Sequence, residues 1–162
     1  MKRFVTVIIS ILALCSTLMA EDAKVIRIST NSDELILLVQ SNGLLEQVYF
    51  GSRLNNEPEV SSLFWDKSDE WNVMNGTGRR NYYETAAAVT HNDGNLSVEL
   101  KYVSHTQKNV PGGTETVINL KDSHYPLDVK LIYTAYKDEN VCTWRTEFSH
   151  NEKKPIILNQ YA

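Results

Sequence analysis

The sequence predicts an all-β protein built as an antiparallel β-sandwich, and three observations lead to that class. Apolar and polar side chains alternate along most of the chain with a period of two, which is the pattern of half-buried strands. Clusters of Gly, Pro, Asn, Asp and Ser separate these stretches at the regular spacing of a sandwich. No stretch keeps a helical period over three turns. The chain has 162 residues, about the length of one domain.

The expected strands follow one another closely along the chain. Residues 34–40 and 44–50 flank a Ser-Asn-Gly turn, so they should form a hairpin. An Asn-Asp-Gly-Asn sequence gives a second hairpin signal between residues 86–89 and 96–105. The other expected strands are residues 25–28, 115–120, 127–136, 141–148 and 156–158. Because no further strand follows, we expect a sandwich that is incomplete at its C-terminus and a final strand without a partner.

Residues 1–20 have the pattern of a secretory signal peptide. Lys2 and Arg3 precede an apolar run at residues 4–14, and a small residue stands at the expected cleavage point. The apolar run is too short to span a bilayer as a mature helix. We therefore expect an exported protein, periplasmic or extracellular, whose β-sandwich occupies residues 21–162 and does not contact a membrane. Cys15 leaves a lipid-anchored protein as the alternative, although Leu14 fits that signal poorly because the position is normally small.

The charge of the mature chain argues against two classes of partner. Removal of Lys2 and Arg3 leaves 14 basic residues against 20 acidic residues, a formal charge of −6. An acidic exported domain is poorly suited to nucleic acid or to an anionic membrane surface. Only Cys142 survives processing, so the mature chain has no internal disulfide. Its place in an alternating strand predicts a buried, unreactive thiol.

A long polar excursion at residues 51–80 interrupts the strands. It has few β-branched residues, and excursions of this length in small domains are usually functional or disordered. Trp65 and Trp71 flank acidic residues that include Asp66, an arrangement suited to stacking a pyranose ring while carboxylates accept its hydroxyl groups. The alternative is that both tryptophans pack on the sheet.

The excursion ends in a loop rich in glycine and arginine. Gly76 and Gly78 indicate a shaped, irregular backbone. Arg79, Arg80 and Asn81 follow at once, and these side chains make directional contacts with polar ligands. The alternative is a structural loop whose arginines are only solvated.

The residue pattern predicts neither a metal site nor a catalytic constellation. The four histidines fall on separate turns and strands without ligand spacing. Serine and histidine occur together only as sequence neighbours, and neighbouring strand residues point to opposite faces, which is wrong for a catalytic triad. Asp66, Asp69, Glu70 and Glu84 contain enough carboxyl groups for a hydrolytic pair, but they stand in or beside a loop that cannot fix their geometry.

Four short motifs occur in order along the mature chain. GLLEQVYFG stands at residues 43–51, NYYETA at 81–86, ETVINLKD at 115–122 and LIYTAY at 131–136. This succession resembles the N-terminal β-sandwich of glycoside hydrolase family 36, the α-galactosidases. The resemblance extends over residues 25–161.

The resemblance implies a part in sugar binding without catalysis. In that family the sandwich precedes a (β/α) barrel with an aspartate nucleophile and an aspartate acid/base, and its loops help to line the sugar pocket, often that of a neighbouring subunit. The candidate substrate-binding residues are Trp65, Asp66, Trp71, Arg79, Arg80 and Asn81. No barrel follows within these residues, so we expect no catalytic residue, no cofactor and no hydrolysis by this chain alone. The implied partners are an α-galactoside-type carbohydrate, the missing catalytic barrel and, in a full-length parent, further copies of the protein.

Two other interpretations stay open at this point. The chain could be a free-standing carbohydrate-binding or assembly module. It could also be a decayed, truncated reading frame.

Overall fold

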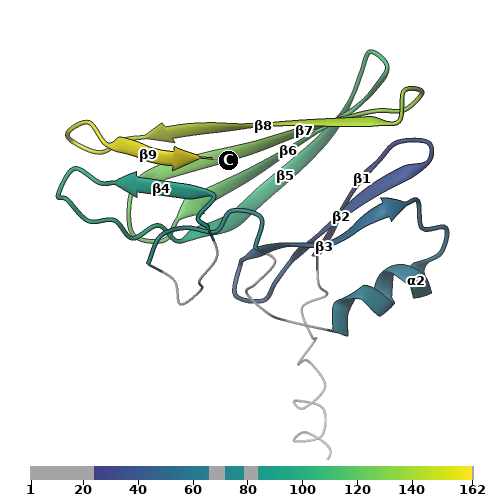
Figure 1. Cartoon of the computed structure of the whole chain (residues 1–162), viewed down its shortest axis with the longest axis horizontal. Helices are drawn as coiled ribbons and strands as arrows, with labels where there is room; N and C mark the ends of the chain where they lie inside the picture. The colour runs from purple at the N-terminus through teal and green to yellow at the C-terminus, as the bar shows by residue number, and fades with distance from the viewer. Residues whose placement is uncertain (1–23, 66–71, 79–83, 162) are drawn as a thin grey trace, which may run out of the picture.

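The computed structural model describes residues 24–65, 72–78 and 84–161, and its elements are labelled in Figure 1. Antiparallel β-sheets make up nearly all of the regular structure in these residues, so the predicted all-β class is confirmed. A three-stranded sheet has the order β1-β2-β3, a four-stranded sheet the order β5-β6-β7-β8, and β4 pairs with β9. The strands are β1 (Lys24–Ser29), β2 (Asp33–Val39), β3 (Leu45–Ser52), β4 (Ala87–Thr90), β5 (Leu100–Val110), β6 (Gly113–Asp122), β7 (Leu127–Tyr136), β8 (Val141–His150) and β9 (Ile157–Tyr161).

One hydrophobic core joins the three sheets. It takes Ile26 and Leu37 from the three-stranded sheet, Ile118 and Val129 from the four-stranded sheet, and Val89 from β4. Each of these side chains is at most 1% exposed. Because strand side chains alternate between faces, β1, β6 and β7 send alternate residues into this core, such as Ile26 and Ile28 of β1 and Ile118 and Leu120 of β6, as the period-two pattern predicted.

The predicted hairpin between β2 and β3 is confirmed. The two strands pair antiparallel over their whole length. The turn is closed by hydrogen bonds from Gly43 N to Gln40 O (2.8 Å) and from Gln40 N to Leu44 O (2.8 Å). Gly43 has φ = +83°, a conformation that costs other L-residues free energy.

The second predicted hairpin is wrong, although its turn forms. Gly94 N donates to His91 O (2.9 Å), but residues 95–99 do not pair with β4 and the next strand begins only at Leu100. The backbone after the turn finds other partners: Val98 N donates to Thr77 O (3.0 Å). A tight turn fixes the chain reversal but not which strands pair after it.

The expectation of an unpaired final strand is also wrong. β9 pairs antiparallel with β4, from Ala87 opposite Tyr161 to Thr90 opposite Ile157. Figure 1 shows β9 returning beside β4 at one end of the molecule. The partner strand lies about seventy residues earlier in the chain, a separation that no local pattern can reveal.

A buried polar cluster ties the turn after β4 to the connection between β8 and β9. His91 is 2% exposed, and its Nδ1 lies 2.7 Å from Glu152 Oε1 while its Nε2 lies 3.0 Å from Ser97 O. The imidazole stacks on the Tyr125 ring at a centroid distance of 3.6 Å. Burial alone would raise the pKa of Glu152, but hydrogen bonds from Asn92 and His91 lower it overall. The cluster therefore holds three connections together around one buried carboxylate.

The excursion after β3 begins with two short helical segments. These are the α-helix α2 (Glu57–Ser61) and the 3₁₀-helix η1 (Ser62–Trp65). Asn56 caps α2, because its side-chain oxygen accepts a hydrogen bond from Glu59 N (2.9 Å). In the part of the chain that the structure describes, no helix is long and apolar enough to cross a membrane. The predicted signal peptide at residues 1–20 lies outside the described residues.

Candidate functional site

The predicted binding residues fall almost entirely in two short segments that interrupt the described chain. Trp65 ends η1, but its side chain is outside the description. Asp66 and Trp71 lie in the segment 66–71, and Arg79, Arg80 and Asn81 lie in the segment 79–83, both outside the described residues. The structure does describe the backbone from which both segments leave, and that backbone has an unusual set of anchors.

A buried ion pair holds the beginning of the excursion. Arg27 Nε donates to Glu34 Oε1 (2.6 Å) and Arg27 Nη2 donates to Glu34 Oε2 (2.9 Å). The same two side chains also bond to the backbone of Leu54: its C=O accepts a hydrogen bond from Arg27 Nη2 (2.9 Å), and its N–H donates to Glu34 Oε2 (3.2 Å). Ser29 Oγ adds a further hydrogen bond to Glu34 Oε1 (2.7 Å). We call Arg27, Ser29, Glu34 and Leu54 the Leu54 clamp.

The charges of the clamp are matched inside the protein. The Glu34 side chain has no solvent exposure, while that of Arg27 is 31% exposed. Burial by itself raises the pKa of Glu34, but the hydrogen bonds from Arg27, Ser29 and the Leu54 backbone, together with the positive charge of Arg27, bring it below its ordinary value of 4.5. The carboxylate is therefore ionised at neutral pH and fixes the point at which the chain leaves β3.

A second anchor holds the strip of residues 72–78 between the two undescribed segments. Asn72 forms an isolated antiparallel bridge with Glu46 of β3, and Val73 N donates to Leu45 O (2.9 Å). Met74 is 3% exposed and belongs to the core. The strip is thus attached to the edge of the three-stranded sheet by both hydrogen bonds and burial.

The two glycines of the strip are required by its geometry, which confirms the predicted shaped backbone. Gly76 bridges to Ala87 of β4, and a Cβ on Gly76 would lie 2.1 Å from Val98 O. Gly78 has φ = +91°, where residues with a side chain are strained. Thr77 O accepts the hydrogen bond from Val98 N, which fastens the strip to the chain leading into β5.

The anchored strip joins the two predicted binding segments and limits the distance between the points where they attach. Residue 72 follows the first segment and residue 78 precedes the second. A chain of this length spans at most about 22 Å when fully extended, because each residue adds no more than about 3.6 Å. The segments with the tryptophans and with the arginines therefore start from one platform between the β3 edge and β4.

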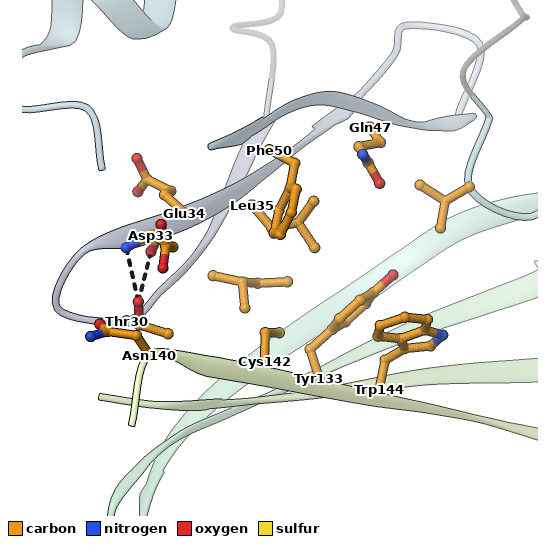
Figure 2. A pocket seen from close by; sticks show the side chains of 12 residues that line it. Thr30, Asp33, Glu34, Leu35, Gln47, Phe50, Tyr133, Asn140, Cys142 and Trp144 are labelled. Atoms are coloured by element: carbon orange, nitrogen blue, oxygen red, sulfur yellow. Dashed lines mark hydrogen bonds between the residues drawn. The ribbon is translucent and has the colours of Figure 1, made fainter. Parts of the chain in front are cut away.

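The structure also contains a groove that the sequence did not indicate. It has a volume of about 390 Å³ and lies between the three-stranded sheet and strands β7 and β8. Figure 2 shows Phe50 reaching from β3 toward Tyr133 on β7 and Trp144 on β8. From sequence alone, an aromatic residue in a strand is expected to point into the core. Only the packing of the two sheets reveals that Phe50, Tyr133 and Trp144 line a groove instead.

Among the described residues, no group of three or more His, Cys, Asp or Glu side chains could hold a metal ion. Glu84, one of the carboxylates considered for catalysis, is exposed and accepts a hydrogen bond from Gln160 Nε2 (2.8 Å). Cys142 is half-buried in the groove, and burial raises the pKa of its thiol. A raised thiol pKa lowers the population of the reactive thiolate.

Residues 43–162 match the family model described as the glycosyl hydrolase family 36 N-terminal domain. The chain belongs to this family. The match begins at the β2–β3 turn and continues through all of the later strands. No curated protein sequence matches the chain.

Solved structures of α-galactosidases share the fold of this N-terminal domain. The α-galactosidase from Lactobacillus brevis matches with a TM-score of 0.71 at 17% identity, over 87% of this chain and 23% of that one. The α-galactosidase AgaB from Geobacillus stearothermophilus matches with a TM-score of 0.68 at 19% identity, over 87% of this chain and 23% of that one. AgaA from the same organism matches with a TM-score of 0.71 at 17% identity, over 85% and 24%. The chain thus spans about a quarter of the length of these enzymes.

Proposed function

We propose that this chain is the non-catalytic N-terminal part of an α-galactosidase-like glycoside hydrolase that acts on α-galactosides in carbohydrate catabolism. The family match over residues 43–162 carries this proposal. Structures that share its fold are α-galactosidases, and one AgaA structure was solved in complex with raffinose. The strands, in this proposal, serve as a scaffold that presents substrate-binding loops to a catalytic domain.

The binding role belongs to the two segments that leave the anchored strip. Trp65 and Trp71 stack on the face of a sugar ring, while Asp66, Arg79, Arg80 and Asn81 bond its hydroxyl groups. The Leu54 clamp at one end of the excursion and Gly76 at the other support this role, because a loop that binds a ligand needs a fixed base. In the full-length parent these loops line the sugar pocket, and the parent forms a homo-oligomer in which a neighbouring subunit contributes them.

The chemistry of hydrolysis lies elsewhere in this proposal. Retaining glycoside hydrolysis requires two carboxyl groups held about 5 Å apart across the scissile bond. A surface loop with several carboxylates does not supply that geometry. We therefore expect the chain without residues 1–20 to release no galactose from an aryl α-galactoside. Turnover that survives purification and disappears in Asp66→Ala or Glu84→Ala would contradict the proposal.

Alanine variants of the loops test the binding role directly. In the full-length parent, Trp71→Ala and Arg79→Ala should each weaken oligosaccharide binding by about tenfold, since a lost aromatic contact and a lost hydrogen bond each cost about 0.5–1.5 kcal/mol. The specificity constant for a short aryl substrate should change much less. Arg145→Ala is the control, because Arg145 is an exposed arginine on β8. Equal losses on long and short substrates would show that the loops are only scaffold.

The proposed location of the protein is the periplasm or the extracellular space. The charged start, the short apolar run and the small residue before Glu21 in the sequence support it. Mass spectrometry of the exported protein should find a chain that begins at Glu21. A chain retained in the cytoplasm with an intact N-terminus would exclude export.

A further inference from the structure

The groove between the two sheets has the dimensions and the chemistry of a small-molecule site. Its volume of about 390 Å³ falls in the range of ligand pockets. Leu35 on β2 and Ile28 on β1 form part of its apolar back, and Val73 of the anchored strip borders it. In Figure 2 the aromatic rings gather toward one end, and Asp33 and Asn140 lie at the other. The groove is therefore apolar along its length and polar at one end.

Two large aromatic side chains are held in solvent on opposite walls. Phe50 of β3 and Trp144 of β8 are each 69% exposed, an uncommon state for side chains of this size. They extend from different sheets toward the same space (Figure 2). Such faces are suited to a saturated ring that presents several C–H groups on one face, because an aromatic face is electron-rich and attracts the weakly positive C–H hydrogens.

The hydroxyl group of Tyr133 gives an independent indication of a polar ligand. Tyr133 is 6% exposed as a residue and lines the groove, and its hydroxyl oxygen is not one of the buried polar atoms that lack a partner, so this oxygen is open to the groove. Burial raises the pKa of Tyr133 to about 12, so the group stays protonated and can donate as well as accept. A purely apolar occupant would leave this hydroxyl without a partner.

Other polar groups in the groove also have hydrogen-bonding capacity to spare. Asn140 uses its Oδ1 to accept from Ser32 N (3.0 Å), and its Nδ2 has no partner within the described part of the chain. The Gln47 side chain is likewise without a partner there. Asp33 accepts from Ser32 Oγ (3.0 Å) at one carboxylate oxygen and leaves the other for a donor. A ligand with several hydroxyl groups would match these donors and acceptors.

We propose that this groove binds a neutral pyranose sugar, with one face of the ring against Trp144 and its hydroxyl groups bonded to Tyr133 and Asn140. Asp33 lines the groove, and its negative charge would repel the charge of an anionic ligand such as a uronate or a sugar phosphate. The described residues that line the groove lie outside the two loop segments of the proposed function, so this proposal does not rest on those segments. A strand of a second copy is the competing occupant, and the experiment below distinguishes the two.

Titration of the full chain with methyl α-D-galactopyranoside, followed by two-dimensional NMR, tests the proposal. The sugar should shift the Trp144 indole N–H and the side-chain amides of Asn140 and Gln47. Mannitol, which has hydroxyl groups but no ring face, and galacturonate, which is anionic, should bind more weakly. Absence of shifts at these groups up to the solubility limit of the sugar would overturn the proposal.

Two variants and a control assign the contacts. Trp144→Ala should weaken binding roughly two- to tenfold, the range expected for one aromatic contact. Tyr133→Phe keeps the ring and removes only the hydroxyl, and it should also weaken binding roughly two- to tenfold. Tyr161→Ala is the matched control, because Tyr161 is also 69% exposed but lies on β9, outside the groove. Thermal unfolding of each variant checks that the fold is retained.

The remaining outcomes separate this site from the loops. Shifts confined to residues 66–71 and 79–83 that are unaffected by Trp144→Ala would support the loop-binding proposal and overturn this one. Sedimentation that shows a dimer, abolished by Trp144→Ala and insensitive to sugar, would assign the groove to a second copy and overturn the proposal. Groove shifts that Tyr133→Phe and Trp144→Ala both weaken would support it even if the loop variants had no effect.

Discussion

Replacement of Arg27 by methionine gives the sharpest test of how the excursion is anchored. The variant keeps most of the volume of the side chain but removes the two hydrogen bonds to Glu34 and the one to Leu54 O. It leaves a carboxylate with no solvent exposure and only Ser29 and the Leu54 N–H as donors. An ionised group left in this way is destabilising, because burial removes its hydration without replacing it.

The expected size of the effect follows from the burial of the two partners. Breaking a buried ion pair costs about 3–5 kcal/mol. Arg27 is itself 31% exposed, so water can replace part of its guanidinium, and we expect a loss near 3 kcal/mol in the free energy of unfolding. For a chain of this size that corresponds to a fall of about 10 °C in Tm. Urea unfolding followed by circular dichroism measures it.

Lys108→Met is the matched control for this prediction. Lys108 and Glu115 also pair across neighbouring strands, at 2.9 Å, but the Lys108 side chain is 67% exposed. An exposed pair of this kind contributes less than about 1 kcal/mol. The double variant Arg27→Met/Glu34→Met should be more stable than Arg27→Met alone, because it also removes the buried carboxylate that has lost its positive partner.

The pH dependence gives the prediction a definite sign. The folded-state pKa of Glu34 lies below 4.5, so its stabilisation is fully present above that pH and is lost as the pH falls through the folded value. In Arg27→Met, Arg27 no longer lowers the pKa of Glu34, and burial acts to raise that pKa. The gap in stability between the two proteins should therefore narrow as the pH falls from neutral to below 4.5. A loss no larger than that of Lys108→Met, or a gap that stays constant with pH, would refute the reasoning.

Three further changes probe other features. Gly76→Ala should lower the free energy of unfolding by about 1–3 kcal/mol, because its Cβ would meet Val98 O at 2.1 Å, and a loss of a few tenths in urea unfolding would contradict this. Glu152→Gln should destabilise the protein at neutral pH and flatten the fall of its stability in acid, since the stabilisation from Glu152 is fully present above the ordinary pKa of 4.5 and is lost as the pH falls through the lower folded-state pKa. An unchanged pH series would count against the pairing of Glu152 with His91. Cys142 should react slowly with a thiol reagent at neutral pH and faster as the pH rises, because burial raises its pKa, and fast labelling at neutral pH would show an accessible thiolate.

Much of the fold could be predicted from local pattern alone. The strands alternate in sequence because each has one face in the core, and the β2–β3 hairpin forms because its turn residues suit the required backbone. The need for glycine at positions 76 and 78 was also visible, since two glycines beside polar residues indicate a constrained backbone. These features depend on neighbours a few residues away.

The candidate site could be predicted only in part. The excursion and its aromatic and basic residues were evident in the sequence, but the Leu54 clamp was not. Arg27 and Glu34 stand on different expected strands, and nothing in either stretch links them to each other or to Leu54, yet Glu34 is 1% exposed. A charged residue is buried only when a partner from another strand satisfies it, and the partner cannot be read from the pattern of one strand.

The sequence by itself determined the class of structure and the position of its turns, because strand period and turn chemistry act over a few residues. Only the tertiary structure decided that β4 pairs with β9 and that Glu152 lies against His91, contacts that each join residues about sixty or more positions apart. It also decided that Phe50, Tyr133 and Trp144 line one groove. The physical reason is the same in each case: burial and hydrogen bonding are satisfied between distant segments, and many pairings of the same strands would satisfy the local pattern equally well.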